Sequence, residues 1–140
     1  MSVQTILLPV FALVALAIGL LISLGPMRAR ALRSGAIGPD AVALDERQWP
    51  DKVRQVGNAY KNQFEVPVLF YALVAFALIT RQADFLFVAM SWIFVALRLV
   101  HAFIHVTSNN VRLRGPVFGS GVMVLAAMWI IFAVRILAAA

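Results

Sequence analysis

The sequence predicts an all-α membrane protein built as a bundle of four transmembrane helices. Of its 140 residues, 63% are hydrophobic and only 13% are charged, and the mean hydropathy is +0.92. A soluble domain of this length exposes more charge than this. Four apolar stretches, near residues 4–26, 62–80, 84–107 and 116–138, are each long enough to cross a bilayer, which takes about 20 residues. Because they use most of the chain, we expect a single transmembrane domain over residues 1–140.

The first span is nearly all Leu, Val, Ala and Ile. No basic residue precedes it, so we predict a retained helix rather than a cleaved signal peptide. Gly25-Pro26 is predicted to end it, because the residue before a proline avoids the helical region. The segment 27–49 then forms the one long loop, with a short interfacial helix over 40–46.

The second helix is predicted from Pro50 to about Thr80. It is longer than the hydrocarbon is thick, so its first turns should project from the membrane. Pro67 lies inside it and is expected to kink it two residues after Glu65.

A short turn at 81–84 makes the second and third helices antiparallel. Ser108-Asn109-Asn110 is predicted to end the third helix. Residues 112–115 are then expected to form a basic connector, and Pro116 to open the fourth helix.

Basic residues are concentrated on one side of the predicted membrane, and the net charge is +6. The side between spans one and two and between spans three and four carries Arg28, Arg30, Arg33, Arg47, Lys52, Arg54, Lys61, Arg112 and Arg114. The opposite side carries only Arg81 and Arg135. Since Lys/Arg excess marks the cytoplasmic side, both termini are predicted on the non-cytoplasmic side. Contact with anionic lipid suffices to explain this charge, so no nucleic-acid partner is expected. The absence of cysteine excludes disulfides, thiolate nucleophiles and Cys-ligated metals.

Several polar residues lie within or next to segments that are predicted to cross the hydrocarbon core of the membrane. On the second helix, Arg54, Asn58, Asn62 and Glu65 fall within an arc of about 80° at 100° per residue. On the third, Arg98, His101 and His105 fall within about 60°. Ionisable groups at this depth are costly unless they pair or line a wet cavity, so the two stripes predict a convergent functional site. Glu65 and Arg98 are its natural ion-pair partners.

Plainer interpretations remain open for each group. The Glu65–Arg98 pair could serve only to fix the register of the two helices, and Asn62 could serve only to form hydrogen bonds between helices. His101 and His105, four residues apart, could hold a metal or a haem, with Glu65 as a third metal ligand. Arginines 112 and 114 are often membrane-surface anchors, as are interfacial tyrosines such as Tyr60.

Two motifs resemble the MAPEG family, the membrane-associated proteins of eicosanoid and glutathione metabolism. The first is Asn62-Gln63-Phe64-Glu65 followed by Pro67-Val68-Leu69-Phe70. The second is Arg98-x-x-His101 followed by Arg112-Leu113-Arg114-Gly115-Pro116. The length, the four spans and the long first loop match as well, so the resemblance covers the whole chain.

The resemblance implies a homotrimer that binds glutathione as a co-substrate near the cytoplasmic face. The chain departs from the family pattern at three positions: Asn58 replaces an arginine, His105 a tyrosine, and Phe118 the arginine that stabilises the glutathione thiolate in the eicosanoid enzymes. Arg114 is the best substitute for that arginine, and His105 is second. The candidate catalytic residues are therefore Arg114 and His105, and the candidate binding residues are Arg28, Arg30, Arg54, Asn58, Lys61, Asn62, Glu65, Arg98, His101 and Arg112. No resident metal is expected.

Three functions compete. The first is a membrane enzyme, a glutathione transferase or peroxidase, acting on a hydrophobic small molecule that the bilayer concentrates. The second is a non-catalytic protein of the same scaffold that binds a lipid or a partner subunit. The third is a metal or haem site on His101 and His105. A donor aimed at the glutathione thiol distinguishes the first from the second, because a nearby cation lowers the pKa of a thiol.

Overall fold

The computed structural model describes residues 1–35 and 37–138, and this part of the chain forms only helices, turns and loops. The elements are α1 (Val3–Arg33), α2 (Pro39–Leu44), η1 (Glu46–Gln48), α3 (Asp51–Lys61), η2 (Asn62–Phe64), α4 (Val66–Ile79), α5 (Phe85–Val106) and α6 (Val111–Ala138). Four segments are long and apolar enough to cross a membrane: Val3–Arg33, Asp51–Ile79, Phe85–Val106 and Val111–Ala138. The predicted all-α, four-span architecture is confirmed.

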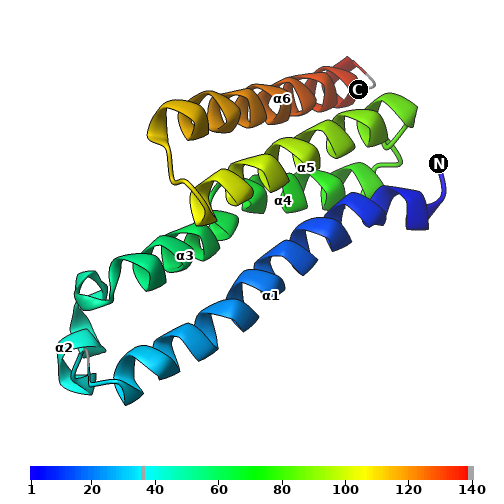
Figure 1. Cartoon of the computed structure of the whole chain (residues 1–140). Helices are drawn as coiled ribbons and strands as arrows, with labels where there is room; N and C mark the ends of the chain where they lie inside the picture. The colour runs from blue at the N-terminus through cyan, green and yellow to red at the C-terminus, as the bar shows by residue number, and fades with distance from the viewer. Residues whose placement is uncertain (36, 139–140) are drawn as a thin grey trace.

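The helices run alongside one another, as Figure 1 shows. Helices α4, α5 and α6 lie side by side, while α1 and α3 extend together past one end of them to the small helix α2. The start of α1, the end of α6 and the α4–α5 turn lie at the opposite end (Figure 1). The predicted polar residues lie near the break between α3 and α4 and near the end of α5 that leads to α6.

Two apolar clusters hold the bundle. The larger joins α1, α4, α5 and α6 through residues such as Leu13, Phe70, Phe94 and Met128, each at most 2% exposed. The smaller lies between α1, α3 and the linker, and consists of Leu20, Leu24, Ala31, Trp49, Val53, Val56 and Ala59. The smaller cluster fixes the direction of α3, and so the place of the polar residues at its end.

The prediction that Gly25-Pro26 ends the first helix is wrong, because α1 continues to Arg33. A proline disfavours helix in the preceding residue partly through that residue's Cβ, which Gly25 lacks. The missing N–H of Pro26 costs one hydrogen bond. Burial of Leu24 and Ala31 in the smaller cluster outweighs that cost. The linker therefore begins at Ser34, and α2 corresponds to the predicted interfacial helix.

The second helix is broken rather than kinked at Pro67. Regular helix stops at Lys61 and resumes at Val66, with the 3₁₀ turn η2 between them. Glu65 connects the two parts with φ −98° and ψ −103°. The break precedes the proline because its ring would clash with the carbonyl four residues earlier, at Gln63. Pro67 instead sits in the first turn of α4, where no intrahelical donor is needed.

The fourth helix begins at Val111, five residues before Pro116. The side chain of Asn110 accepts a hydrogen bond from the backbone N–H of Arg112 at 3.0 Å and so caps the helix. Residues 112–115, predicted as a connector, are thus the first turns of α6. The third span ends as expected, and its start is capped by Asp84, which accepts from the N–H of Phe87 at 2.9 Å.

Candidate functional site

The break between α3 and α4 explains why Arg98 is buried. Because α3 ends at Lys61 and a 3₁₀ turn follows, the carbonyl of Asn62 lies outside the regular α-helical hydrogen-bond pattern. Arg98 Nη2 donates to this carbonyl at 2.9 Å from α5. Broken helices are tolerated at membrane depth when a neighbouring helix satisfies the freed backbone groups. Arg98, only 2% exposed, has that role here.

Asn62 lies between Arg98 and Glu65, so these two are connected through an amide. Arg98 Nη2 donates to Asn62 Oδ1 at 2.7 Å, and Asn62 Nδ2 donates to Glu65 Oε2 at 2.8 Å. Among the described residues, the ion pairs within 4.0 Å do not include Glu65 with Arg98. The direct pair expected from sequence is therefore replaced by a three-residue chain. This chain fixes the orientation of the Asn62 amide.

A cavity of about 250 Å³ opens beside this chain between the α3–α4 break, α5 and α6. Its lining residues are Asn62, His101, His105, Val111, Arg114, Gly115 and Phe118. Both candidate catalytic residues and two of the candidate binding residues therefore meet at one place. The walls combine an amide, two imidazoles, a guanidinium and a phenyl ring. Such a mixture suits a polar ligand with an apolar co-substrate beside it.

The two histidines form a pair inside α5. Their ring centres lie 5.7 Å apart, and the ring of His101 lies 5.5 Å from that of Phe118. Both side chains are buried, and the Nδ1 atom of each has no hydrogen-bond partner in the described structure. Buried polar atoms of this kind usually find a partner. No hydrogen bond in the described structure satisfies these two nitrogens, and both are buried from solvent.

The two arginines at the start of α6 differ in position. Arg114 lines the cavity, and its Nη1 donates to Asn109 Oδ1 in the α5–α6 connection. Arg112 is exposed and does not line the cavity. Arg30 is exposed too, near the end of α1. Of the candidate arginines on these two helices, Arg114 is the one that lines the cavity.

The remaining candidates gather on the other side of α3, facing α1. Glu46 of η1 pairs with Arg28 and with Lys61. Arg54 and Asn58 line a small pocket with Arg28, and Arg54 is also paired with Asp51 at 2.7 Å. The single stripe expected from helical periodicity is thus split in two, because the chain leaves regular helix at Asn62. We call the group of Arg28, Glu46, Trp49, Arg54, Asn58 and Lys61 the basic cluster.

Sequence reasoning missed three residues that hold the site together. Gln55 Nε2 donates to the carbonyls of His105 and Thr107 at 2.7 and 3.0 Å, and Lys52 Nζ donates to that of Val106. Both therefore cap the end of α5 from α3. Gln63, 2% exposed, donates to Ala59 O at 2.9 Å.

Acid–base properties outside the spans follow from local ion pairs. In the linker, hydrogen bonds from Arg47 to its carboxylate lower the pKa of Asp45 to about 2. At the opposite end of the bundle, Arg135 and the N–H of Phe87 lower the pKa of Asp84 below its usual value. Both acids are therefore ionised at neutral pH.

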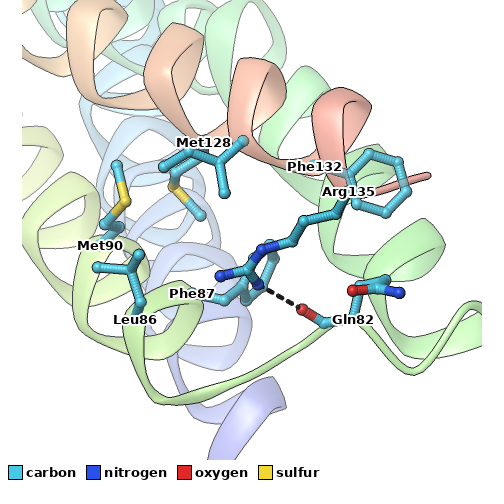
Figure 2. Close-up of a pocket in the computed structure, with 8 residues that line it drawn as sticks. Gln82, Leu86, Phe87, Met90, Met128, Phe132 and Arg135 are labelled. Carbon is cyan, nitrogen blue, oxygen red and sulfur yellow. Dashed lines mark hydrogen bonds between the residues drawn. The ribbon is translucent and has the colours of Figure 1, made fainter. Parts of the chain in front are cut away.

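An apolar crevice between α5 and α6 lies far from the cavity, near the chain ends. Figure 2 shows Leu86, Phe87 and Met90 facing Met128, while Arg135 reaches toward Gln82. Its free space is about 10 Å³, room for one water molecule. It is too small for a substrate. Arg135 closes it by donating to Gln82 O at 3.4 Å and pairing with Asp84 at 2.7 Å.

A metal site on His101 and His105 would need a third ligand. Within residues 1–35 and 37–138, no three His, Cys, Asp or Glu side chains are grouped to share an ion. Glu65, the third ligand considered, is hydrogen-bonded to Asn62 instead.

Comparison with known proteins identifies a family. A family model described as the MAPEG family matches residues 6–134, nearly the whole chain. No curated protein and no solved structure matches the chain.

Proposed function

Because the chain belongs to the MAPEG family, we propose that it is a membrane-embedded enzyme that activates glutathione against apolar electrophiles or peroxides. Membership makes it an integral, multi-pass membrane protein of the family of glutathione and eicosanoid metabolism. The single observation that carries the finer proposal is the cavity that brings together Asn62, His105 and Arg114.

The cavity residues suit the parts of glutathione. Amide and imidazole groups bind peptide amides and carboxylates, and Arg114 supplies a fixed positive charge. A positive charge near a thiol stabilises the thiolate, which is the nucleophile. Asn62 is held by Arg98 and Glu65, so its amide is preorganised for binding.

The proposed transferase reaction proceeds in two steps. The glutathione S–H proton is transferred to the imidazole of His105 or to water, and the thiolate is stabilised by Arg114. The thiolate then attacks the electrophilic carbon, a C–S bond forms, and the leaving group departs with the bonding electrons. With a peroxide the thiolate attacks oxygen instead, an alcohol leaves, and a second glutathione reduces the sulfenic acid to give the disulfide and water. The co-substrate reaches the cavity from the lipid, past Phe118.

We extend the proposal to assembly and orientation. The protein is expected to form a homotrimer in lipid, with both termini on the non-cytoplasmic side. The Lys/Arg excess at the cavity end supports this orientation. Mass measurement in mild detergent tests the trimer.

A non-catalytic scaffold is the second candidate, and one observation favours it. Phe118 lines the cavity against His101, and a phenyl ring cannot donate a hydrogen bond to sulfur. We therefore expect turnover to be slow, with little eicosanoid isomerase activity.

The test is the thiolate absorbance and conjugation rate of the purified protein with glutathione and an apolar aryl electrophile. Loss of a preorganised donor costs about 10²–10³ in rate, so Arg114→Gln should lower the rate by at least tenfold. His105→Phe, which keeps an aromatic ring but removes the ring nitrogens, should lower it less. Arg33→Gln removes the same charge from the exposed end of α1 and serves as the matched control. Absence of thiolate and turnover in the wild type favours the scaffold; fast turnover in all variants refutes the roles of Arg114 and His105.

A further inference from the structure

The turn between α4 and α5 has an arginine at a position where glycine is usual. The backbone N–H of Gln82 donates to Ala77 O at 2.9 Å, and that of Arg81 donates to Leu78 O at 3.2 Å. These two bonds form a Schellman motif, in which the residue just past the helix is left-handed and most often glycine. Arg81 has φ +57°, a conformation that costs more for a residue with a Cβ than for glycine. The backbone of the turn therefore does not account for an arginine here.

The guanidinium of Arg81 lies at this end of the bundle without an acidic partner. Asp84 and Arg135 border the same hollow but pair with each other at 2.7 Å. Arg81 is exposed, and the ion pairs and side-chain hydrogen bonds found within residues 1–35 and 37–138 do not include it. A guanidinium presents its N–H donors in a planar fork that matches the oxygens of a phosphate group. Arg81 is therefore free to bind an anion of this kind.

Arg81 borders both an apolar and a polar space. An apolar crevice of about 330 Å³ opens between the start of α1 and the end of α4. Arg81 lines this crevice together with apolar residues that include Val3, Ile6, Ala77 and Leu78. It also lines the wider polar hollow of about 570 Å³ that contains the Asp84–Arg135 pair. Because the second span ends at Ile79, both spaces lie at the level where lipid headgroups meet acyl chains.

We propose that Arg81 binds the phosphate of a membrane phospholipid, and that an acyl chain of this lipid lies in the crevice between α1 and α4. A free phosphate ion would use the guanidinium but leave the apolar crevice empty, whereas a phospholipid matches both spaces. The site lies at the opposite end of the bundle from the cavity lined by His105 and Arg114 (Figure 1), so it does not depend on the proposed function.

The experiment uses a fluorescent label beside the crevice, because basic residues at the other end of the bundle also attract anionic lipid. The chain has no cysteine, so Ile79→Cys, at a position 78% exposed, gives a single site for a bimane label. The full-length protein in detergent is titrated with phosphatidic acid or diacylglycerol that carries the same brominated acyl chains, which quench bimane. These two lipids differ only in the phosphate. A label on Leu113→Cys, at the cavity end, is the control for position.

The label at position 79 should be half-quenched at about a fivefold lower concentration of phosphatidic acid than of diacylglycerol, the change expected from one arginine at a membrane surface. Arg81→Asn and Arg81→Gly should abolish this preference, because both residues tolerate positive φ but carry no charge. Arg33→Gln removes the same charge from the exposed end of α1 and should keep it. Val3→Trp, which fills part of the crevice, should weaken quenching by both lipids.

Two further measurements separate charge from folding and lipid from free phosphate. Arg81→Gly should melt no lower than the wild type in lipid-free detergent, because glycine relieves the positive φ. Inorganic phosphate, with ionic strength matched by sodium chloride, should not reverse the quenching by phosphatidic acid.

Three results would overturn the proposal. The first is an unchanged preference for phosphatidic acid in both Arg81 variants. The second is an equal loss of the preference at the Leu113 label, which would mean that Arg81 does not act locally. The third is reversal of quenching by inorganic phosphate, which would show that a free anion rather than a phospholipid occupies the site.

Discussion

Replacing Arg98 by methionine should destabilise the protein by removing the donor for the broken helix. Arg98 Nη2 lies 2.9 Å from Asn62 O, 2.7 Å from Asn62 Oδ1 and 3.5 Å from Gln63 Oε1. A buried acceptor left without a donor costs about 1–3 kcal/mol. Water from the cavity can reach the Asn62 side chain, and the contact to Gln63 is long. The backbone carbonyl of Asn62 and partial losses at the other two acceptors then give about 2–4 kcal/mol.

One effect opposes this loss, and a double-mutant cycle isolates the contribution of the Arg98–Asn62 contact. Methionine avoids the desolvation of a buried guanidinium, which by itself favours the variant. Asn62→Ala removes one acceptor, so its effect should be smaller in the Arg98→Met background by about 1 kcal/mol or more. The free energy of unfolding is measured by SDS titration in mixed micelles. An Arg98→Met protein within about 0.5 kcal/mol of the wild type, with additive effects in the cycle, would show that Arg98 does not stabilise the break.

Three further results are expected. The pKa of Asp84 is lowered by Arg135, so ionised Asp84 should stabilise the fold above its unfolded pKa of 3.8 and lose this effect as the pH falls toward its folded pKa. The pH dependence of the free energy of unfolding below about pH 4 should therefore be smaller in Asp84→Asn, and an unchanged pH profile would contradict this expectation. In Gly57→Ala the added Cβ meets only ordinary contacts at 3.9–4.0 Å, and the variant gains helix propensity of up to about 1 kcal/mol. Gly57→Leu should instead lower the melting temperature, because the larger side chain collides with Leu24. Equal melting temperatures of the two variants would refute the close approach of α1 and α3. Phe118→Arg places a donor at the cavity, so the conjugation rate should rise by about tenfold or more, and an unchanged rate would mean that this position does not face the thiol.

The spans were predictable because they depend on hydrophobicity and length alone. The positions at which helices end inside apolar or amphipathic segments were harder to predict from the sequence. The sequence rule for Gly25-Pro26 failed because tertiary packing of Leu24 and Ala31 decided the outcome. The start of α6 was predicted too late in the chain because its cap, Asn110, lies outside the apolar run. The basic residues in the first turns of α6 are also typical of a loop that connects two spans.

The sequence predicted the convergence of part of the polar group, but not the geometry of that group. Helical periodicity correctly brought Asn62, His101 and His105 toward one place. It failed for Arg54 and Asn58, because periodicity assumes an unbroken helix and the chain leaves regular geometry at Asn62. Contacts between residues far apart in sequence, such as Glu46 with Lys61, carry no local pattern and require the fold.

Calorimetric titration of glutathione into the detergent-purified wild type, Arg114→Gln and Arg33→Gln proteins tests the central claim most directly. The claim predicts saturable binding to the wild type, unchanged binding to Arg33→Gln, and at least about tenfold weaker binding to Arg114→Gln, because a charge-assisted contact contributes about 1.5–3 kcal/mol. Absence of binding to the folded wild type, or equal affinity in all three proteins, would contradict a glutathione site in the cavity.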